Sequence, residues 1–297
     1  MTKPALVDRL EAFLDVLKYE RNLSVKTQEN YRRQILAIMD NIDIEDWSVL
    51  SITHVHKVLS EGRKKNLSAR SIALRLSALR TFCDYLVSQN VLLSNPAKAV
   101  QSPKLGKPLP KNLNVDEINQ LLNVEPESVL AIRDRAMMEL TYGCGLRLAE
   151  LAALNIQDVQ TAGQVKVLGK GSKERIIPVG KMALVWIKKW LQVRNQLAPP
   201  TEENALFVSK HKRRISHRQI AKRMSLWAGK QALAQKVNPH KLRHSYATHM
   251  LESSGDLRAV QELLGHANLS TTQVYTHLDF QHLAKVYDTA HPRARKK

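Results

Sequence analysis

Residues 95–114, NPAKAVQSPKLGKPLPKNLN, separate two long stretches of helical pattern. Four prolines and Gly106 interrupt any helix in this stretch, so it predicts an extended linker between domains. Its four lysines make the linker basic and suit a path along a polyanion. We therefore expect a helical domain over 1–100, a basic proline-rich linker over 101–112 and a second domain over 113–297.

Before the linker, apolar residues recur at helical spacing in four stripes, which predicts four packed helices. The stripes are Leu6, Leu10, Phe13, Leu14 and Leu17; Tyr31, Ile35, Ile38 and Met39; Val55, Val58 and Leu59; and Ile72, Leu76, Leu79, Phe82 and Leu86. Basic residues gather around the fourth stripe: Arg63, Lys64, Lys65, Arg70, Arg75 and Arg80. They suit contact with phosphates, and a merely solvated basic face is the alternative.

After the linker, short helices are expected around one β-hairpin. Asn114 with Glu117 forms a capping box that starts a helix. Residues 164–168 alternate, a glycine-rich turn follows and 175–179 return, which predicts the hairpin, and 205–208 could add a short strand. Further helix starts are expected at Ser216, Asn238, Asp256 and Ser270. The predicted fold class is mainly α with a small sheet, in two domains.

Composition favours a nucleic-acid partner. The chain has 297 residues, of which 46 are Lys or Arg and 27 Asp or Glu, so its formal net charge is +19. A generically basic, ribosomal-type protein is the alternative. Cys83 and Cys144 lie in apolar helical sequence and are expected to be reduced and buried. No apolar run has membrane-spanning length, so we expect a soluble cytoplasmic protein.

Charged residues within otherwise apolar stretches are the candidate catalytic residues. Arg147 follows two glycines and begins an apolar helical run, where a guanidinium needs an anion. An ion pair with Glu150 is the structural alternative. Lys170 lies at the glycine-flanked tip of the predicted hairpin, where it can reach outward or simply be solvated.

Further candidates follow in the second half of the chain. His240 and Arg243 share a face at a helix start, and His266 follows a helix-ending glycine. Tyr275 is predicted at a helix start, where the backbone dipoles favour a developing phenolate, although a packing tyrosine is the ordinary interpretation. A zinc pair of His240 and His244 is disfavoured, because no acidic residue lies between them and no cysteine pair accompanies them.

As a set, two arginines, one lysine and two histidines around a tyrosine suit attack on a phosphodiester. Two guanidiniums can hold the non-bridging oxygens, on which negative charge grows. A histidine can assist loss of the tyrosine proton, and a lysine can protonate the leaving oxygen. With this much cationic charge, neither a metal ion nor ATP is expected.

The fragments GLRLAEL, GKGSKER, HKLRH, LLGH and TTQVYTHL resemble the active-site boxes of the tyrosine recombinases, the phage integrase family, in order and spacing. The resemblance covers nearly the whole chain and implies a core-binding domain followed by a catalytic domain. It implies that Arg147 and Arg243 clamp the scissile phosphate and that Lys170 is the general acid. It further implies that His240 assists proton transfer and that His266 hydrogen-bonds the phosphate.

The same resemblance implies that Tyr275 attacks the DNA and forms a covalent 3′-phosphotyrosine. GKGSKER and STTQVYTHL are most similar to the Xer branch of the family. That branch implies resolution of chromosome and plasmid dimers at a short DNA site, in a heterotetramer with the sister recombinase XerD under a septal DNA translocase. It also implies a terminal segment that docks on the neighbouring protomer, while packing on its own domain is the alternative. The residues of that segment are Leu278, Phe280, Leu283, Val286 and Tyr287.

Two rival functions remain. A type IB-like topoisomerase, which nicks and reseals DNA without exchange, would use the same groups. A non-catalytic DNA-binding protein would be expected to have lost at least one of them, and this chain has all six.

Overall fold

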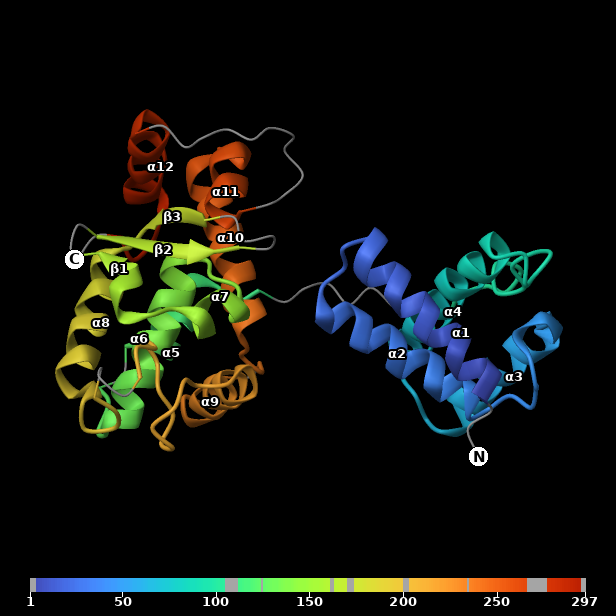
Figure 1. Cartoon of the computed structure of the whole chain (residues 1–297). Coiled ribbons are helices and arrows are strands. Elements are labelled where there is room, and N and C mark those ends of the chain that lie inside the picture. Colours follow the sequence, from blue (N-terminus) through green and yellow to red (C-terminus); the bar gives the residue numbers. More distant parts are fainter. Residues whose placement is uncertain are drawn as a thin grey trace. The chain divides into compact units, whose positions relative to one another are not determined.

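The computed structural model divides the chain into two compact units, Met1–Leu109 and Pro110–Lys297 (Figure 1). The residues that it describes are 4–104, 112–123, 125–160, 163–169, 174–199, 203–233, 235–265 and 277–294. In the last of these ranges, side chains are described for 283–294.

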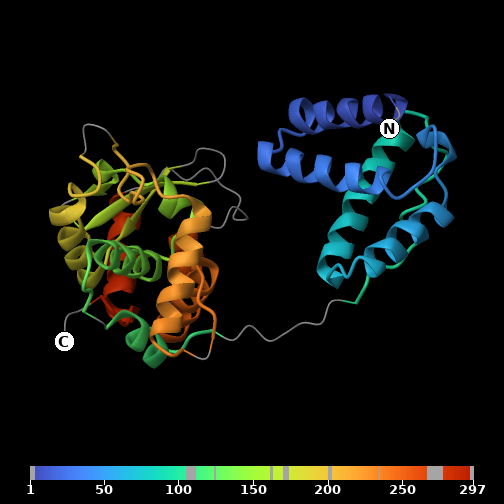
Figure 2. The same ribbon diagram turned by 90° about the horizontal axis from the view of Figure 1, so that it is seen from below.

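The first unit is a helical bundle. Its helices are α1 (Pro4–Asp15), which continues into a π-helical turn η1 (Val16–Glu20), α2 (Val25–Met39), α3 (Ile52–Lys64) and α4 (Ala69–Ser88), with a 3₁₀ turn η2 (Trp47–Val49). Helices α1 and α2 lie side by side, and α4 crosses them (Figure 2). The four predicted stripes lie on these helices. Phe82 makes edge-to-face contacts with Phe13 and Trp47 at the centre of the core.

Three of the basic residues near the fourth stripe have partners: Lys64 pairs with Glu61 and Lys65 donates to Asn41 at the surface, while Arg80 binds main-chain carbonyls. Arg80 donates from Nε to the carbonyl of Ala97 at 3.0 Å and from Nη2 to that of Val100. Arg80 therefore fixes the segment after α4 and is not simply a solvated side chain. Arg75 is half-buried, and Arg63, Lys64, Lys65 and Arg70 are exposed; phosphate contact by these five stays a prediction.

The second unit contains the predicted hairpin and a set of short helices. The strands are β1 (Val159–Gln160), β2 (Gln164–Leu168) and β3 (Glu174–Pro178), antiparallel in the order β1-β2-β3. The helices are α5 (Val115–Leu122), α6 (Val129–Cys144), α7 (Leu148–Ala153), α8 (Lys181–Arg194), α9 (His217–Lys230), α10 (Pro239–Ser254), α11 (Leu257–Leu264) and α12 (His277–Ala290), with a 3₁₀ turn η3 (Ile156–Asp158). The predicted caps at Asn114, Ser216, Asn238 and Asp256 are confirmed; Ser270 lies outside the described residues.

Helix α6 forms the centre of this unit, and α8 and α10 pack against it (Figure 2). Helix α12 packs on α10 and β3, with Leu283 and Tyr287 buried in the same core. Beyond α12, Arg293 donates to both carboxylate oxygens of the buried Glu139, at 3.0 and 2.6 Å. The described part of the C-terminal segment thus packs on its own domain. Docking of this segment on a neighbouring protomer stays a prediction.

The expected strand over 205–208 is wrong among the described residues, because the backbone there makes only isolated bridges, Asn155 with Ala205 and Val208 with Arg214. The reason is that two main-chain carbonyls of this segment accept hydrogen bonds from side chains and not from a neighbouring strand. Trp190 Nε1 donates to Leu206 O at 2.8 Å, and Arg194 Nε donates to Ala205 O at 3.1 Å.

Two further expectations can be compared with the structure. Cys83 and Cys144 are both free thiols and both buried, as expected. Within the described ranges, every helix is too short or too polar to cross a membrane.

Candidate active site

The end of α6 leads directly into Arg147. Gly145 ends α6 in the left-handed conformation, with φ of +59°. A Cβ atom at Gly145 would lie 2.5 Å from the Tyr246 ring, so the turn needs glycine for its φ and for its space. The turn places Arg147 at the N-cap of α7, where its backbone N–H donates to Glu150 Oε2 at 2.9 Å. Arg147 is therefore fixed through its backbone as well as its side chain.

The buried carboxylate of Glu150 joins three arginines from three parts of the unit. Arg147 Nη1 donates to Oε1 at 2.8 Å. Arg175, on β3, donates from Nη1 to Oε1 at 2.8 Å and from Nη2 to Oε2 at 2.9 Å. Arg243, on α10, places Nη1 3.9 Å from Oε2. Burial raises the pKa of Glu150. The hydrogen bonds and charge of Arg175, followed by the hydrogen bonds of Arg147, outweigh burial and lower that pKa to about 2.

Arg243 is held by two main-chain carbonyls. Its Nη1 donates to Gly145 O and its Nη2 donates to Leu264 O at 2.8 Å. Burial lowers the pKa of Arg243, and the neighbouring charge of Arg147 lowers it further, to about 10. Arg243 is still charged at neutral pH, but it lies in a surplus of positive charge. An anion is the ligand that relieves such a surplus.

The two arginines of the predicted clamp meet at the end of α11. Arg147 Nη2 donates to Gly265 O at 2.9 Å, next to the Leu264 carbonyl that Arg243 uses. The Arg147 side chain keeps 36% of its surface exposed. Each guanidinium carries more N–H donors than these contacts use. The structure therefore places Arg147 and Arg243 side by side at this turn, and it also shows the ion pair of Arg147 with Glu150 that was the structural alternative.

The other predicted site residues are placed less fully. His240 is exposed on the first turn of α10, three residues before Arg243. Lys170, His266 and Tyr275 lie outside the described residues. Where side chains are described, no cluster of three or more His, Cys, Asp or Glu could hold a metal ion.

Sequence reasoning missed Arg175, which appeared only as part of the returning strand. Its register gives the signal that could have found it. Arg175 pairs with Val167, and Ile177, two residues on, pairs with Val165, so alternation puts Arg175 on the buried face. An arginine on the buried face of a hairpin needs a carboxylate nearby, and Glu150 supplies it.

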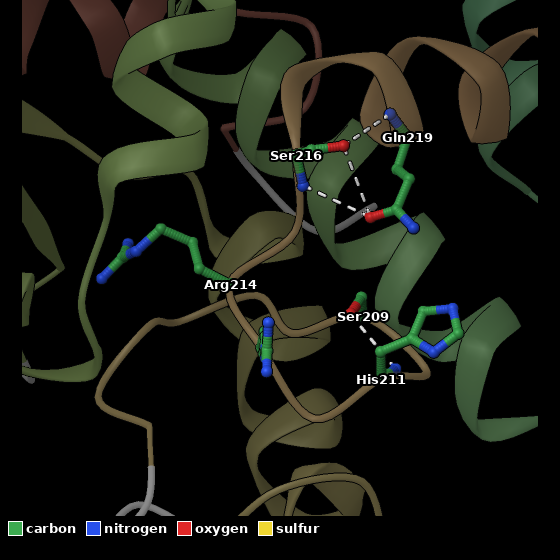
Figure 3. A pocket seen from close by; sticks show the side chains of 6 residues that line it. Ser209, His211, Arg214, Ser216 and Gln219 are labelled. Carbon is green, nitrogen blue, oxygen red and sulfur yellow. Dashed lines mark hydrogen bonds between the residues drawn. The ribbon is translucent and has the colours of Figure 1, made fainter.

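Helix α7, which carries Glu150, is also fixed at its far end. Arg214 Nη1 donates to the carbonyls of Ala152, Ala153 and Leu154, at 3.0, 2.8 and 3.0 Å. Arg214 lines an open depression beside the start of α9, where the Ser216 and Gln219 capping contacts are visible (Figure 3). The remaining lining residues are Ser209, His211 and Arg213. A guanidinium that binds the last carbonyls of a helix offsets their partial negative charge. Both ends of α7 are therefore held in place.

This arrangement can bind a tetrahedral anion. Two guanidiniums are fixed on one buried carboxylate and on the carbonyls around Gly145 and Gly265, so their free N–H groups need no reordering when an anion arrives. Paired, charge-assisted hydrogen bonds of this kind suit phosphate oxygens.

Comparison with known proteins identifies the family of this chain. Residues 111–282 match the model of the phage integrase family, and residues 10–90 match that of the phage integrase N-terminal SAM-like domain. The chain is 54% identical to a tyrosine recombinase XerC of Vibrio campbellii over 292 residues, 97% of this chain and 93% of that protein. It is 53% identical to a tyrosine recombinase XerC of Serratia marcescens over 297 residues, 99% of this chain and 97% of that protein.

Solved structures show the same fold. A lambda integrase (75–356) dimer bound to a COC′ core site superposes with a TM-score of 0.70 at 19% identity, covering 91% of this chain and 98% of that one. The XerH site-specific recombinase bound to its difH substrate, in a pre-cleavage complex, superposes with a TM-score of 0.65 at 25% identity, covering 92% and 82%. The predicted resemblance is confirmed: this chain belongs to the phage integrase family and is a site-specific tyrosine recombinase.

Proposed function

We propose that this recombinase cuts and rejoins DNA through Tyr275, with Arg147 and Arg243 as the clamp on the scissile phosphate. The observation that carries the proposal is the pair of guanidiniums fixed on one buried carboxylate, each with N–H groups to spare. Tyr275 follows the α11 turn in the chain by ten residues, and that turn binds both arginines.

The proposed reaction conserves the phosphodiester energy. The Tyr275 hydroxyl oxygen attacks phosphorus, the bond from phosphorus to the 5′ oxygen breaks, and a 3′-phosphotyrosine forms. His240 assists loss of the tyrosine proton, Lys170 protonates the leaving 5′ oxygen, and His266 hydrogen-bonds the phosphate. A 5′ hydroxyl from the partner strand then attacks the same phosphorus and releases the tyrosine.

The same proposal assigns partners. The substrate is a short double-stranded DNA site, in keeping with the net charge of +19 and with the DNA-bound XerH and lambda integrase complexes. The near-full-length likeness to XerC proteins supports a heterotetramer with XerD, acting in the cytoplasm to resolve chromosome and plasmid dimers. A septal DNA translocase would be its regulator.

Covalent capture tests the nucleophile and identifies the DNA site in one experiment. Fragmented chromosomal DNA is incubated with the chain, the mixture is denatured in detergent, and DNA that stays attached to protein is sequenced. The wild type should retain one recurrent sequence, while Tyr275→Phe, which keeps the ring and loses only the hydroxyl, should retain none. Attached DNA from Tyr275→Phe would contradict the assignment.

The captured site then separates the alternatives. Two labelled duplexes carrying it, mixed with the chain and XerD, should yield exchanged strands, whereas a topoisomerase would only nick and reseal. We infer that the arginines supply the cationic charge that a metal ion supplies elsewhere, so adducts should form in chelator and without ATP. Loss of the adduct in chelator would refute that part of the proposal.

A further inference from the structure

Arg175 is buried beneath the candidate site, and no step of the proposed chemistry uses it. Its side chain keeps 7% of its surface exposed. Both terminal nitrogens donate to Glu150 in a fork-to-fork pair, at 2.8 and 2.9 Å. Because these two nitrogens are directed at the carboxylate and the group is buried, Arg175 is not placed to bind a phosphate itself.

The same guanidinium also supports the end of α11. A Cβ atom at Gly265 would lie 2.9 Å from Arg175 Nε and 3.0 Å from both Cζ and Nη1. Gly265 adopts φ of +64°, so its bare α-carbon is placed directly against Arg175. Among the described residues, the buried Nε–H of Arg175 has no hydrogen-bond partner. The close approach of Gly265 accounts for that costly unpaired donor, because it closes off this side of the group.

Arg175 therefore contacts both supports of the clamp. Glu150 binds Arg147 and faces Arg243. The turn at Gly265 supplies the carbonyl that accepts from Arg147, and the Leu264 carbonyl before it accepts from Arg243.

We propose that Arg175 is a positioning residue for the phosphate clamp, acting through Glu150 and Gly265. Its fork occupies the carboxylate, which leaves Arg147 and Arg243 only partly neutralised and free to face an anion. Without it, Glu150 would pair more fully with those two arginines and draw them away from the phosphate. The role rests on the proposed function of Arg147 and Arg243.

The test uses the full chain and a nicked duplex of the captured site, on which the adduct accumulates. Arg175→Met should bind this duplex with a dissociation constant within about twofold of the wild type, and form adduct slower by about 10–100-fold, the cost typical of groups that orient a reacting site from behind. Arg175→Lys should recover only part of the rate, because an ammonium cannot make the fork. Gly265→Ala should also slow adduct formation, although it removes no charge.

Arg194→Lys is the matched control. Arg194 is also buried in the same unit, but it binds the carbonyls of Ala198 and Ala205, away from Glu150. Arg194→Lys should lower the unfolding temperature and leave the cleavage rate of the folded protein unchanged. Two results would overturn the inference. One is cleavage by Arg175→Met at the wild-type rate. The other is an Arg175→Met variant that loses stability, as Arg194→Lys does, and loses DNA binding and cleavage with it.

A failure of the proposed function looks different. In that case the wild type itself forms no adduct. The crystal structure of Arg175→Met then decides about Arg175: guanidiniums of Arg147 and Arg243 in unchanged positions overturn the inference, and displacement toward Glu150 supports it.

Discussion

Replacing Glu150 by glutamine should destabilise the second unit by about 3 kcal/mol at neutral pH. Its pKa is lowered from the ordinary 4.5 to about 2, and each pKa unit corresponds to about 1.4 kcal/mol. Glutamine keeps the shape of the side chain but removes the charge that Arg175 and Arg147 bind. It also turns an amide donor toward arginine donors, where no acceptor replaces the lost oxygen.

The sign of the pH dependence follows from the direction of that pKa. A carboxyl whose pKa is lower in the folded state stabilises the fold above its unfolded pKa. The stabilisation is lost as pH falls through the folded pKa. The wild type should therefore lose this contribution between pH 4.5 and about 2, and the difference between wild type and Glu150→Gln should shrink over the same window.

Urea unfolding across this pH window measures the difference. Three of the four tryptophans, Trp186, Trp190 and Trp227, lie in the second unit, so fluorescence reports mainly its unfolding, while circular dichroism reports both units. Glu174→Gln is the matched control, since Glu174 is exposed on β3 and, among the described residues, pairs with Lys166 at the surface. That change should cost about 0–1 kcal/mol.

Two results would refute the reasoning. One is a Glu150→Gln variant no less stable than Glu174→Gln at neutral pH. The other is a cost that stays constant down to about pH 2, because a constant cost would come from shape and not from charge.

Three further perturbations test neighbouring parts of the site. Arg243→Ala should bind DNA yet cleave it slower by about 100- to 1000-fold in single turnover, and near-wild-type cleavage would remove Arg243 from the clamp. Lys170→Ala should be slow on an ordinary nicked duplex and recover when sulfur replaces the leaving 5′ oxygen, since a thiolate leaves without a proton; absence of recovery argues against a general acid. Arg214→Met should lower the unfolding temperature of the second unit by removing the donor on the last carbonyls of α7, at a cost of about 1.5–3 kcal/mol, and an unchanged temperature would show that α7 does not need this contact.

Most helix boundaries could be predicted because their signals are local. Asn114 and Ser216 have a capping partner three residues on, and Gly145 ends α6 because only glycine suits its φ and the Tyr246 ring. The hairpin followed from alternation on either side of a glycine-rich turn. In contrast, β1 has only two residues, Val159 and Gln160, and is too short to show an alternating pattern of apolar and polar residues.

The connections within the site could not be predicted, because they depend on which elements meet. Arg147 and Glu150 are three residues apart, so their ion pair was a natural alternative. The contact of Glu150 with Arg175 joins α7 to β3, and that of Arg147 with Gly265 spans more than a hundred residues. The prediction for the apolar run at 205–208 failed for a related reason, since the carbonyls of Ala205 and Leu206 accept from the side chains of Arg194 and Trp190 instead of from a neighbouring strand.

The anchoring of Arg293 limits how the chain can be shortened or fused to other proteins. A chain cut after Leu278 would remove Leu283 and Tyr287 from the core, and with them Arg293, which donates to Glu139. Such a chain would test folding more than assembly, so surface substitutions are the better probe of contact between protomers. A fusion partner joined beyond residue 294, the last residue that the structure describes, leaves the pairing of Arg293 with Glu139 intact.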